Sequence, residues 1–316
     1  MKKNFITLCL ITLYASLITG CETPKEPAVT DGLNIKTEEI IIAGLEGEYR
    51  FLFFSDLHMA LAGEGDSPEI RDYVAERSAA FDGASSLTAP AKLAALVEAA
   101  NAQTLDAVLM GGDIIDCPTP AALASLSQNL KLLDAPYLFA LGNHDYTFPW
   151  EYFSEKSLTE YLPELATSVD VAADGFSILE LDGLVVVALD DSTNQINPAA
   201  LSRLEAVLAQ QKPVIILMHV PLVTDGNADL LAKSLEVWGP DPEGNSRVLL
   251  GFSGLWPNEG SRRFMDMIFA KDSPVVAILA GHAHFPHRDV LEPGIVQIIA
   301  APAYEGNATI IEIKGQ

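Results

Sequence analysis

The histidines of this chain are concentrated in short polar motifs, and each motif directly follows an apolar run. Asp and Asn share these motifs with His. Carboxylate and amide oxygens mixed with imidazole nitrogens suit Mn, Fe, Zn or Co, rather than Ca or a metal held by thiolates. The motifs are Ser55-Asp56-Leu57-His58, Gly111-Gly112-Asp113, Gly142-Asn143-His144-Asp145, His219 and Gly281-His282-Ala283-His284.

Two of the motifs place candidate ligands at alternate positions, as in Asp56/His58 and His282/His284. Alternate residues of an extended chain project to the same side, so each pair can reach a common site. A lone His at a strand end is more often structural, but five such motifs in series are hard to obtain by chance. Two metal ions about 3.5–4 Å apart can stabilise the attacking and leaving oxygens of a displacement at phosphorus. The motifs therefore predict a metal site of a kind suited to such a displacement.

Apolar runs of strand length alternate with helical patterns along the chain, which favours an α/β fold. Ligands are then expected in loops after the carboxyl ends of the strands. The first two strands are predicted to form a hairpin through a turn at 44–47. The predicted strands span 35–43, 49–54, 107–110, 137–140, 184–189, 214–218, 275–279, 295–299 and 309–313, and the predicted helices span 67–80, 90–102, 120–132, 198–210 and 260–270.

Together the motifs resemble the five-block signature of the calcineurin-like metallophosphoesterases, over roughly residues 35–314. The resemblance implies a four-layer α-β-β-α sandwich with two mixed β-sheets and two divalent metal ions at one sheet edge. It implies that Asp56, His58 and His284 bind the first metal, that Asn143, His219 and His282 bind the second, and that Asp113 bridges the two.

The resemblance also implies a catalytic role for His144, outside the metal ligands, as proton donor to the leaving oxygen or stabiliser of the phosphoryl oxygens. Asp145 would orient His144, as carboxylates commonly do beside a catalytic imidazole. No Arg matches the phosphate-clamping Arg of the protein-phosphatase branch, so such a residue would come from a loop. His287 is interpreted as a surface or supporting residue, and Asp190-Asp191 as turn and capping residues.

Substrate specificity is expected to reside in three insertions after the motifs, at 59–90, 146–165 and 223–263. The second and third are rich in aromatic residues, and the third, with its Gly and Pro, is predicted to be a shaped loop rather than a helix. These aromatic side chains either contact a base, lipid or aryl leaving group or anchor the loops to the domain.

The N-terminus is typical of an export signal. Lys2 and Lys3 precede a mainly apolar stretch that is too short for a membrane span, and Ile18-Thr19-Gly20-Cys21 resembles a bacterial lipobox. We therefore predict a signal peptide at 1–20, a tether at 21–33 and one domain at 34–316. The protein would be lipid-anchored at Cys21 on the extracytoplasmic side of the bacterial cell envelope. The alternative is an ordinary signal peptide that contains Cys21.

The formal net charge of -24 argues against nucleic acid as a partner, because so acidic a surface repels phosphate backbones. Only Cys117 remains after the signal and the predicted lipid site, and no activating residues flank it, so a buried structural role is expected. The sequence thus predicts a phosphatase or phosphodiesterase acting on a small phosphoester. The alternatives are a catalytically inactive metal-binding surface lipoprotein of the same fold, a nuclease and a solute-binding lipoprotein.

Overall fold

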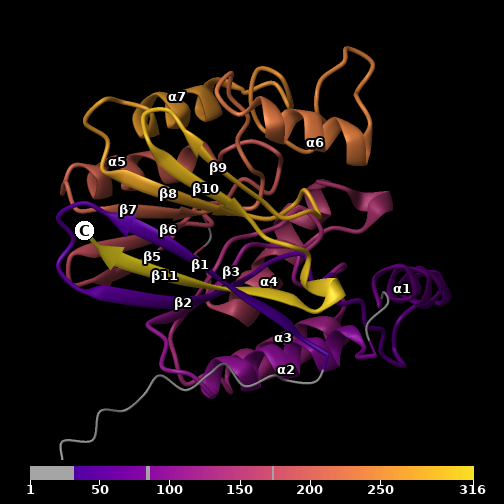
Figure 1. The fold of residues 1–316 in the computed structure, drawn as a ribbon. Coiled ribbons are helices and arrows are strands. Elements are labelled where there is room, and N and C mark those ends of the chain that lie inside the picture. Colours follow the sequence, from indigo (N-terminus) through magenta and orange to yellow (C-terminus); the bar gives the residue numbers. More distant parts are fainter. Residues whose placement is uncertain (1–31, 83–85, 173) are drawn as a thin grey trace, which may run out of the picture.

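Strands and helices alternate along the chain and assemble into two mixed β-sheets (Figure 1). The computed structural model describes residues 32–82, 86–172 and 174–316. One sheet has the strand order β1-β11-β2-β3-β4 and the other β5-β6-β7-β8-β10-β9. The strands are β1 (Asn34–Ile42), β2 (Glu48–Phe54), β3 (Ala107–Met110), β4 (Tyr137–Phe139), β5 (Ser177–Leu181), β6 (Leu184–Ala188), β7 (Val214–Leu217), β8 (Val275–Ala280), β9 (His287–Leu291), β10 (Ile295–Ile299) and β11 (Asn307–Gly315).

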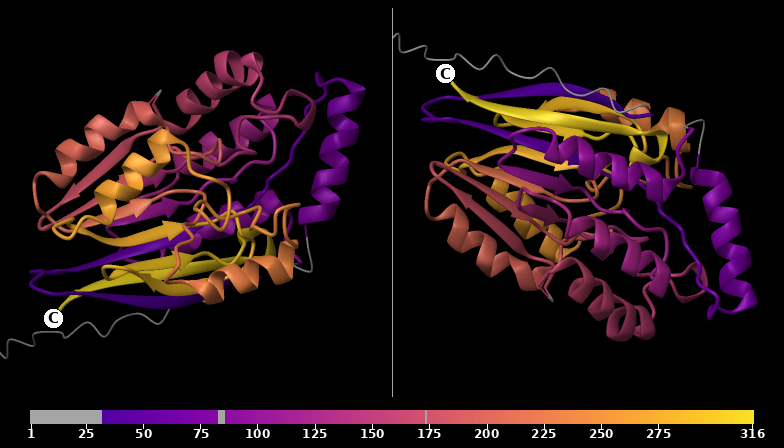
Figure 2. Two further views of the ribbon diagram at one scale, coloured as in Figure 1. Left: turned by 90° about the horizontal axis from the view of Figure 1, so that it is seen from above. Right: turned by 90° about the horizontal axis from the view of Figure 1, so that it is seen from below.

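Helices cover the outer face of each sheet (Figure 2). Leucines of α2 and α3 pack on the first sheet, and those of α5, with Phe264 of α7, pack on the second. None of the described helices has the length and apolar character needed to cross a bilayer. The α-helices are α1 (Pro68–Phe81), α2 (Ala89–Asn101), α3 (Pro120–Leu130), α4 (Leu162–Val169), α5 (Leu201–Leu208), α6 (Ala228–Trp238) and α7 (Glu259–Ile268).

The period-2 pattern of β2 explains how the layers stack. Phe51 and Phe53 project into the core between the two sheets, whereas Leu52 and Phe54 project into the core under the helices. Every one of these side chains is buried. A strand that is apolar on both faces must be covered on both faces. The predicted four-layer α-β-β-α sandwich with two mixed sheets is therefore confirmed.

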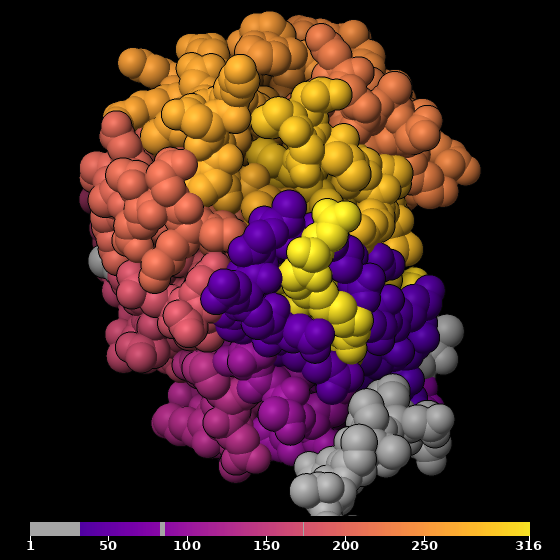
Figure 3. All heavy atoms as spheres, turned by 60° about the vertical axis from the view of Figure 1, so that its left-hand side comes forward, coloured from indigo at the N-terminus to yellow at the C-terminus, as the bar shows by residue number. Residues whose placement is uncertain are grey.

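The predicted hairpin of the first two strands is wrong. β11 lies between β1 and β2, parallel to β1 and antiparallel to β2. Figure 3 shows this strand in yellow, flanked by the indigo N-terminal strands. The turn at 44–47 does connect two antiparallel strands, β1 and β2. However, β11, from the far end of the described chain, lies between them. Local turn signals cannot reveal such an insertion.

The third insertion also differs from its prediction, because it contains a helix. α6 begins at Ala228, and its residue Leu230 is buried. Helix α4 and the edge strands β5 and β9 of the second sheet were not predicted either. The signal peptide predicted at 1–20 and the tether up to residue 31 lie outside the described residues.

The strands that precede the polar motifs run parallel within each sheet. β2, β3 and β4 are parallel neighbours in the first sheet, as are β7 and β8 in the second. Their carboxyl ends therefore meet at one edge of the sandwich, which brings the five motifs together as expected.

Candidate metal centre

Candidate ligands form two neighbouring groups that share Asp113. Ligand atoms of Asp113 lie within 4.8 Å of those of the other members in both groups. Asn143 joins the second group, because its Oδ1 lies 3.2 Å from Nε2 of His219. The first group contains Asp56, His58, Asp113 and His284, and the second contains Asp113, His219 and His282. The structure thus brings all seven predicted ligands together in the predicted division.

Hydrogen bonds fix the tautomer of His58 in the first group. Its Nδ1 lies 2.8 Å from Oδ1 of the Asp116 carboxylate and donates a hydrogen bond to it. The Nε2 of neutral His58 therefore carries a lone pair, and this atom faces Nε2 of His284 at 3.0 Å. Nε2 of His284 in turn lies 3.4 Å from Oδ1 of Asp56.

The second group shows the same arrangement. Nδ1 of His219 lies 2.7 Å from the carbonyl oxygen of Gly111, which can only accept, so a lone pair remains on Nε2 of the neutral ring. That atom lies 3.1 Å from both Nδ1 of His282 and Oδ2 of Asp113. Imidazoles that bind a metal usually donate their other N–H in this way.

These donor atoms fit a pair of divalent cations. Ligands about 2.1 Å from one ion are about 3 Å apart when they are adjacent in its coordination sphere. The separations of 3.0 to 3.4 Å described above match that spacing. Converging lone pairs repel one another unless a proton or a metal ion lies among them, and the mixed nitrogen and oxygen donors suit Mn, Fe, Zn or Co.

The electrostatics of the centre favour positive charge. Burial would raise the pKa of Asp113, but His219 and His144 hold it well below its usual range. Burial would lower the pKa of His219, yet the charge of Asp113 and the hydrogen bond to it raise that pKa to about 10. Burial and the neighbouring His219 lower the pKa of His282 to about 3. The lowered pKa of Asp113 and the raised pKa of His219 thus show that the site favours one positive charge beside the shared carboxylate, while the His282 ring next to it stays neutral.

Five of the seven candidate ligands have a left-handed backbone, which is uncommon for residues other than Gly. This corrects the expectation that Asp56/His58 and His282/His284 are parts of an extended chain. The two histidines of the latter pair consequently reach different groups. Such backbone strain is concentrated at functional sites, where surrounding contacts maintain it. The residues are Asp56 (φ 57°), His58 (φ 49°), Asp113 (φ 53°), His282 (φ 64°) and His284 (φ 56°).

Two motif glycines allow the loops to approach one another closely. A Cβ on Gly142 would lie 2.2 Å from the backbone nitrogen and Oδ1 of Asp113. A Cβ on Gly281 would lie 1.8 Å from Oγ of Ser55 and 2.6 Å from Oδ2 of Asp56. Side chains at either position would push the candidate ligands apart, so the requirement for Gly here is steric.

Asp145 does not make the contact expected of it. Its buried carboxylate accepts hydrogen bonds from the backbone N–H groups of Gly142, Asp113, Ile114 and Ile115, at 2.7 to 3.0 Å. Asp145 therefore ties together the loops that carry Asp113 and His144. Asp191 does the same for the loop after β7, where it accepts from the backbone of His219 and Val220. The predicted capping role of Asp191 agrees with these bonds.

The side chain of His144 contacts Asp116 instead. Nδ1 of His144 lies 3.1 Å from Oδ1 of Asp116, and the imidazole is 29% exposed. Asp116 was not among the predicted site residues, although its place three residues after Asp113 in one loop was a usable signal. His58, Asp116 and His144 are close enough to hold a third ion. However, Arg77 already pairs with this carboxylate, so the cluster is an ion-pair network.

Other predicted features lie around the centre. Cys117 is buried, and burial and the charge of Asp116 raise its pKa to about 12, which fits a structural thiol. His287 is outside the ligand groups, and its Nε2 lies 3.6 Å from Oδ2 of Asp289. Trp238 donates a hydrogen bond to the carbonyl oxygen of Ala283, and its ring lies 5.4 Å from that of His284. This aromatic side chain of α6 is therefore placed beside a candidate ligand.

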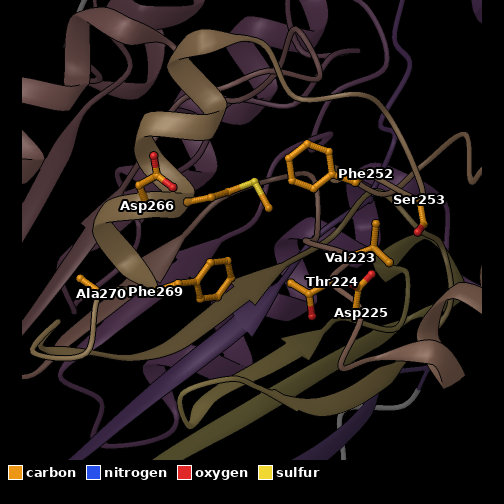
Figure 4. A pocket seen from close by; sticks show the side chains of 9 residues that line it. Val223, Thr224, Asp225, Phe252, Ser253, Asp266, Phe269 and Ala270 are labelled. Atoms are coloured by element: carbon orange, nitrogen blue, oxygen red, sulfur yellow. The ribbon is translucent and has the colours of Figure 1, made fainter.

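A cavity of about 360 Å³ lies between the loop after β7 and α7 (Figure 4). Phe252, Met265 and Phe269 are among its apolar lining residues, and Asp225 and Asp266 also line it. None of the candidate metal ligands lines it. The cavity is therefore separate from the metal centre.

The layered fold and its clustered Asp and His ligands define a metallophosphoesterase-like protein. A family model described as calcineurin-like phosphoesterase matches residues 49–286, so the chain belongs to this family. It is similar to the solved structure of a dimetal phosphatase from Danio rerio, with 14% identity, 81% of this chain and 88% of that chain covered, and a TM-score of 0.47.

A second similar structure is the purple acid phosphatase PPD1 from yellow lupin (Lupinus luteus) seeds. The identity is 14%, the match covers 83% of this chain and 45% of that chain, and the TM-score is 0.45. No curated protein sequence matches the chain.

Proposed function

We propose that this protein hydrolyses phosphomonoester or phosphodiester bonds of a small substrate. Two divalent metal ions and the side chain of His144 would be the catalytic groups. The observation that carries the proposal is the sharing of Asp113 between two ligand groups, with the backbone N–H of His144 bonded to that shared carboxylate. Asp56, His58 and His284 would hold one ion, Asn143, His219 and His282 the other, and Asp113 both. When bound, the ions supply an activated water and neutralise charge on the phosphoryl oxygens.

His144 has the geometry of a group that acts on the substrate. Its Nδ1 contacts Asp116, so Nε2 is the nitrogen that is available to a substrate. The side chain is partly exposed. Its backbone N–H donates to Oδ1 of Asp113 at 2.8 Å, so the position of His144 is tied to the shared carboxylate. Burial would lower the pKa of His144, but the charge of Asp113 and the hydrogen bond to Asp116 raise it, which favours the imidazolium with a proton on each nitrogen. From Nε2 the imidazolium can give a proton to the leaving oxygen or donate a hydrogen bond to a phosphoryl oxygen.

The cellular location is part of the same proposal. The positive residues, apolar stretch and lipobox-like Ile18-Thr19-Gly20-Cys21 support export and a lipid anchor at Cys21. The tether predicted at 21–33 would then connect the anchor to the domain. The enzyme would act on small phosphoesters at the extracytoplasmic face of the cell envelope.

The test uses the full-length chain purified in detergent. The protein is treated with a chelator, then assayed with Mn, Fe, Zn or Co on p-nitrophenyl phosphate and bis(p-nitrophenyl) phosphate. We expect metal-dependent hydrolysis of at least one substrate. Asp113→Asn should abolish it while the protein stays folded, because a shared carboxylate is the hardest ligand to replace. Asp134→Asn, at an exposed carboxylate, is the matched control.

Two results would contradict the proposal. Wild-type protein that binds two metals but hydrolyses neither substrate would indicate an inactive metal-binding protein of the same fold. An Asp113→Asn variant that binds two metals and keeps more than a few per cent of the activity would show that Asp113 is not the ligand shared by the two ions.

A further inference from the structure

Helix α1 lies at one end of the molecule, outside the helical layers that cover the sheets (Figures 1 and 2). It belongs to the insertion after the first motif, and Val74 is its only buried residue. The helix contacts the metal centre near its C-terminal end, through Arg77 and Phe81. Val74 packs in a small apolar cluster with Ala60, Cys117 and Phe148. The contacts of Arg77 and Phe81 with the metal centre are additional to this packing.

Arg77 forms a two-pronged ion pair with Asp116. Its Nη2 lies 2.9 Å from Oδ1 of Asp116, and its Nε donates to Oδ2. The Asp116 side chain is fully buried, whereas that of Arg77 is 24% exposed. The planar guanidinium matches both carboxylate oxygens at once, which a Lys ammonium cannot do. Arg77 therefore fixes the orientation of the carboxylate as well as balancing its charge.

One oxygen of that carboxylate connects three functional groups. Oδ1 of Asp116 lies 2.8 Å from Nδ1 of His58, 3.1 Å from Nδ1 of His144 and 2.9 Å from Nη2 of Arg77. A rotation of the carboxylate would loosen both imidazoles together. The ion pair with Arg77 opposes that rotation.

Phe81 supports the same arrangement from the side. Its ring stacks on the imidazole of His58, with centroids 4.1 Å apart and planes inclined by 7°, and the guanidinium of Arg77 lies 4.6 Å from the centroid of the Phe81 ring. Asp82, the next residue, is bonded to α2, because its carbonyl oxygen accepts from Nζ of Lys92 at 2.9 Å. The end of α1 is thus fastened where Arg77 meets the site.

We propose that Arg77 is a positioning residue for phosphoester hydrolysis, which holds Asp116 and, through it, orients His144 toward the leaving group. The inference rests on the proposed function and extends it, because it makes catalysis depend on an insertion outside the five motifs. Arg77 is not assigned a contact with the substrate. Loss of Arg77 should therefore lower kcat more than it changes KM.

The experiment compares Arg77→Ala, Arg77→Lys and Arg77→Gln in the full-length chain, with Arg71→Ala on the same helix as the matched control. Kinetics are measured on an alkyl phosphate and on p-nitrophenyl phosphate, together with metal content. We expect Arg77→Ala to lower kcat for the alkyl phosphate about 10- to 100-fold, as for other residues that orient a functional side chain. The loss for the aryl phosphate should be smaller, since its leaving group needs little protonation.

Two further readouts separate positioning from a general structural role. Guanidinium ion at about 50 mM, far below unfolding concentrations, should partly restore kcat in Arg77→Ala but not in His144→Asn. Arg77→Lys should fall between the wild type and Arg77→Ala, because it supplies charge without the planar fork. If Arg77→Ala does not fold, the same comparisons are made with Arg77→Gln and Arg77→Lys.

Three outcomes would overturn the inference while leaving the proposed function intact. The variants could have wild-type kcat on both substrates, lose activity equally on both, or raise KM with kcat unchanged. The last pattern would place Arg77 in substrate binding. Failure of the wild-type enzyme to hydrolyse any phosphoester with metal would instead refute the proposed function.

Discussion

Asp116 and His144 share a contact that assigns the two nitrogens of the imidazole different tasks. Oδ1 of Asp116 lies 3.1 Å from Nδ1 of His144, and the carboxylate is fully buried. A buried carboxylate that accepts from Nδ1 holds the ring in one tautomer and one orientation. The nitrogen available to a substrate is then Nε2.

His144→Asn should lower kcat while both metals remain bound. General acid catalysis typically contributes about 10²–10⁴-fold, so the loss should fall in that range for an alkyl phosphate. An aryl phosphate with an acidic phenol should lose less. Kinetics on the two substrates with metal analysis make the comparison, and His287→Asn, outside the ligand groups, is the control.

Equal losses on both substrates would indicate that His144 stabilises the phosphoryl oxygens rather than protonating the leaving group. Loss of a metal ion from His144→Asn would place His144 among the ligands, against the grouping described above.

Asp145→Ala should destabilise the fold and release metal, because it leaves four buried backbone N–H groups without an acceptor. Each unsatisfied buried group costs about 1–3 kcal/mol, so we expect a loss of about 3 kcal/mol or more in the free energy of unfolding. Chemical denaturation measures this loss, with Asp134→Ala as the exposed control. If the variant has wild-type stability but its kcat depends differently on the leaving group, Asp145 orients His144 instead.

Asp116 should make stability depend on pH in the acid range. Burial would raise the pKa of Asp116, but hydrogen bonds from Arg77, His144 and His58 hold it far below its usual range. A carboxyl group whose pKa is lowered by folding contributes stability above its unfolded pKa of about 3.9 and loses it as the pH falls. The stability advantage of the wild type over Asp116→Asn should therefore be constant near about pH 6 and shrink toward about pH 3.

Urea denaturation of the chelator-treated wild type and Asp116→Asn at several pH values gives this difference. An advantage that grows on acidification would mean that folding raises the pKa of Asp116, contrary to the contacts that surround it.

Cys21→Ala should release the protein from membranes, because it removes the predicted lipid site. Fractionation of cells that express the two forms, followed by a salt wash, tests the expectation. A variant that still sediments with membranes after the wash would show that Cys21 is not the principal anchor.

The polar motifs located the cluster of candidate ligands because the residues that form it are local to each motif. Each motif directly follows a buried strand, and parallel strands bring such ends together whatever lies between them. Asp116 could also have been found, since it shares a loop with Asp113. Arg77 could not, because it reaches the site from an insertion whose path depends on tertiary packing.

The fold predictions failed where pairing is non-local or patterns are short. The turn at 44–47 indicated a hairpin, but the partner of β1 is β11, and Asn34 pairs with Asn307, 273 positions away. α6 was hidden by the Gly, Pro and aromatic residues that follow it, although Leu230, Leu231 and Leu235 have helical spacing. β5 and β9 lie at the edges of the second sheet, where burial is partial and the apolar signal is weak.

β11 lies between β1 and β2, and this position governs when the first sheet can form. Among the described strands, β1 pairs only with β11, and β2 has β11 on one side. The first sheet therefore cannot close on a ribosome until the chain has been synthesised as far as Gly315. Contacts between such distant segments also slow the search for the native pairing. Until β11 is made, β1 has no partner among the described strands and β2 is paired only with β3, so both strands leave backbone hydrogen-bonding groups open on the side that β11 will fill.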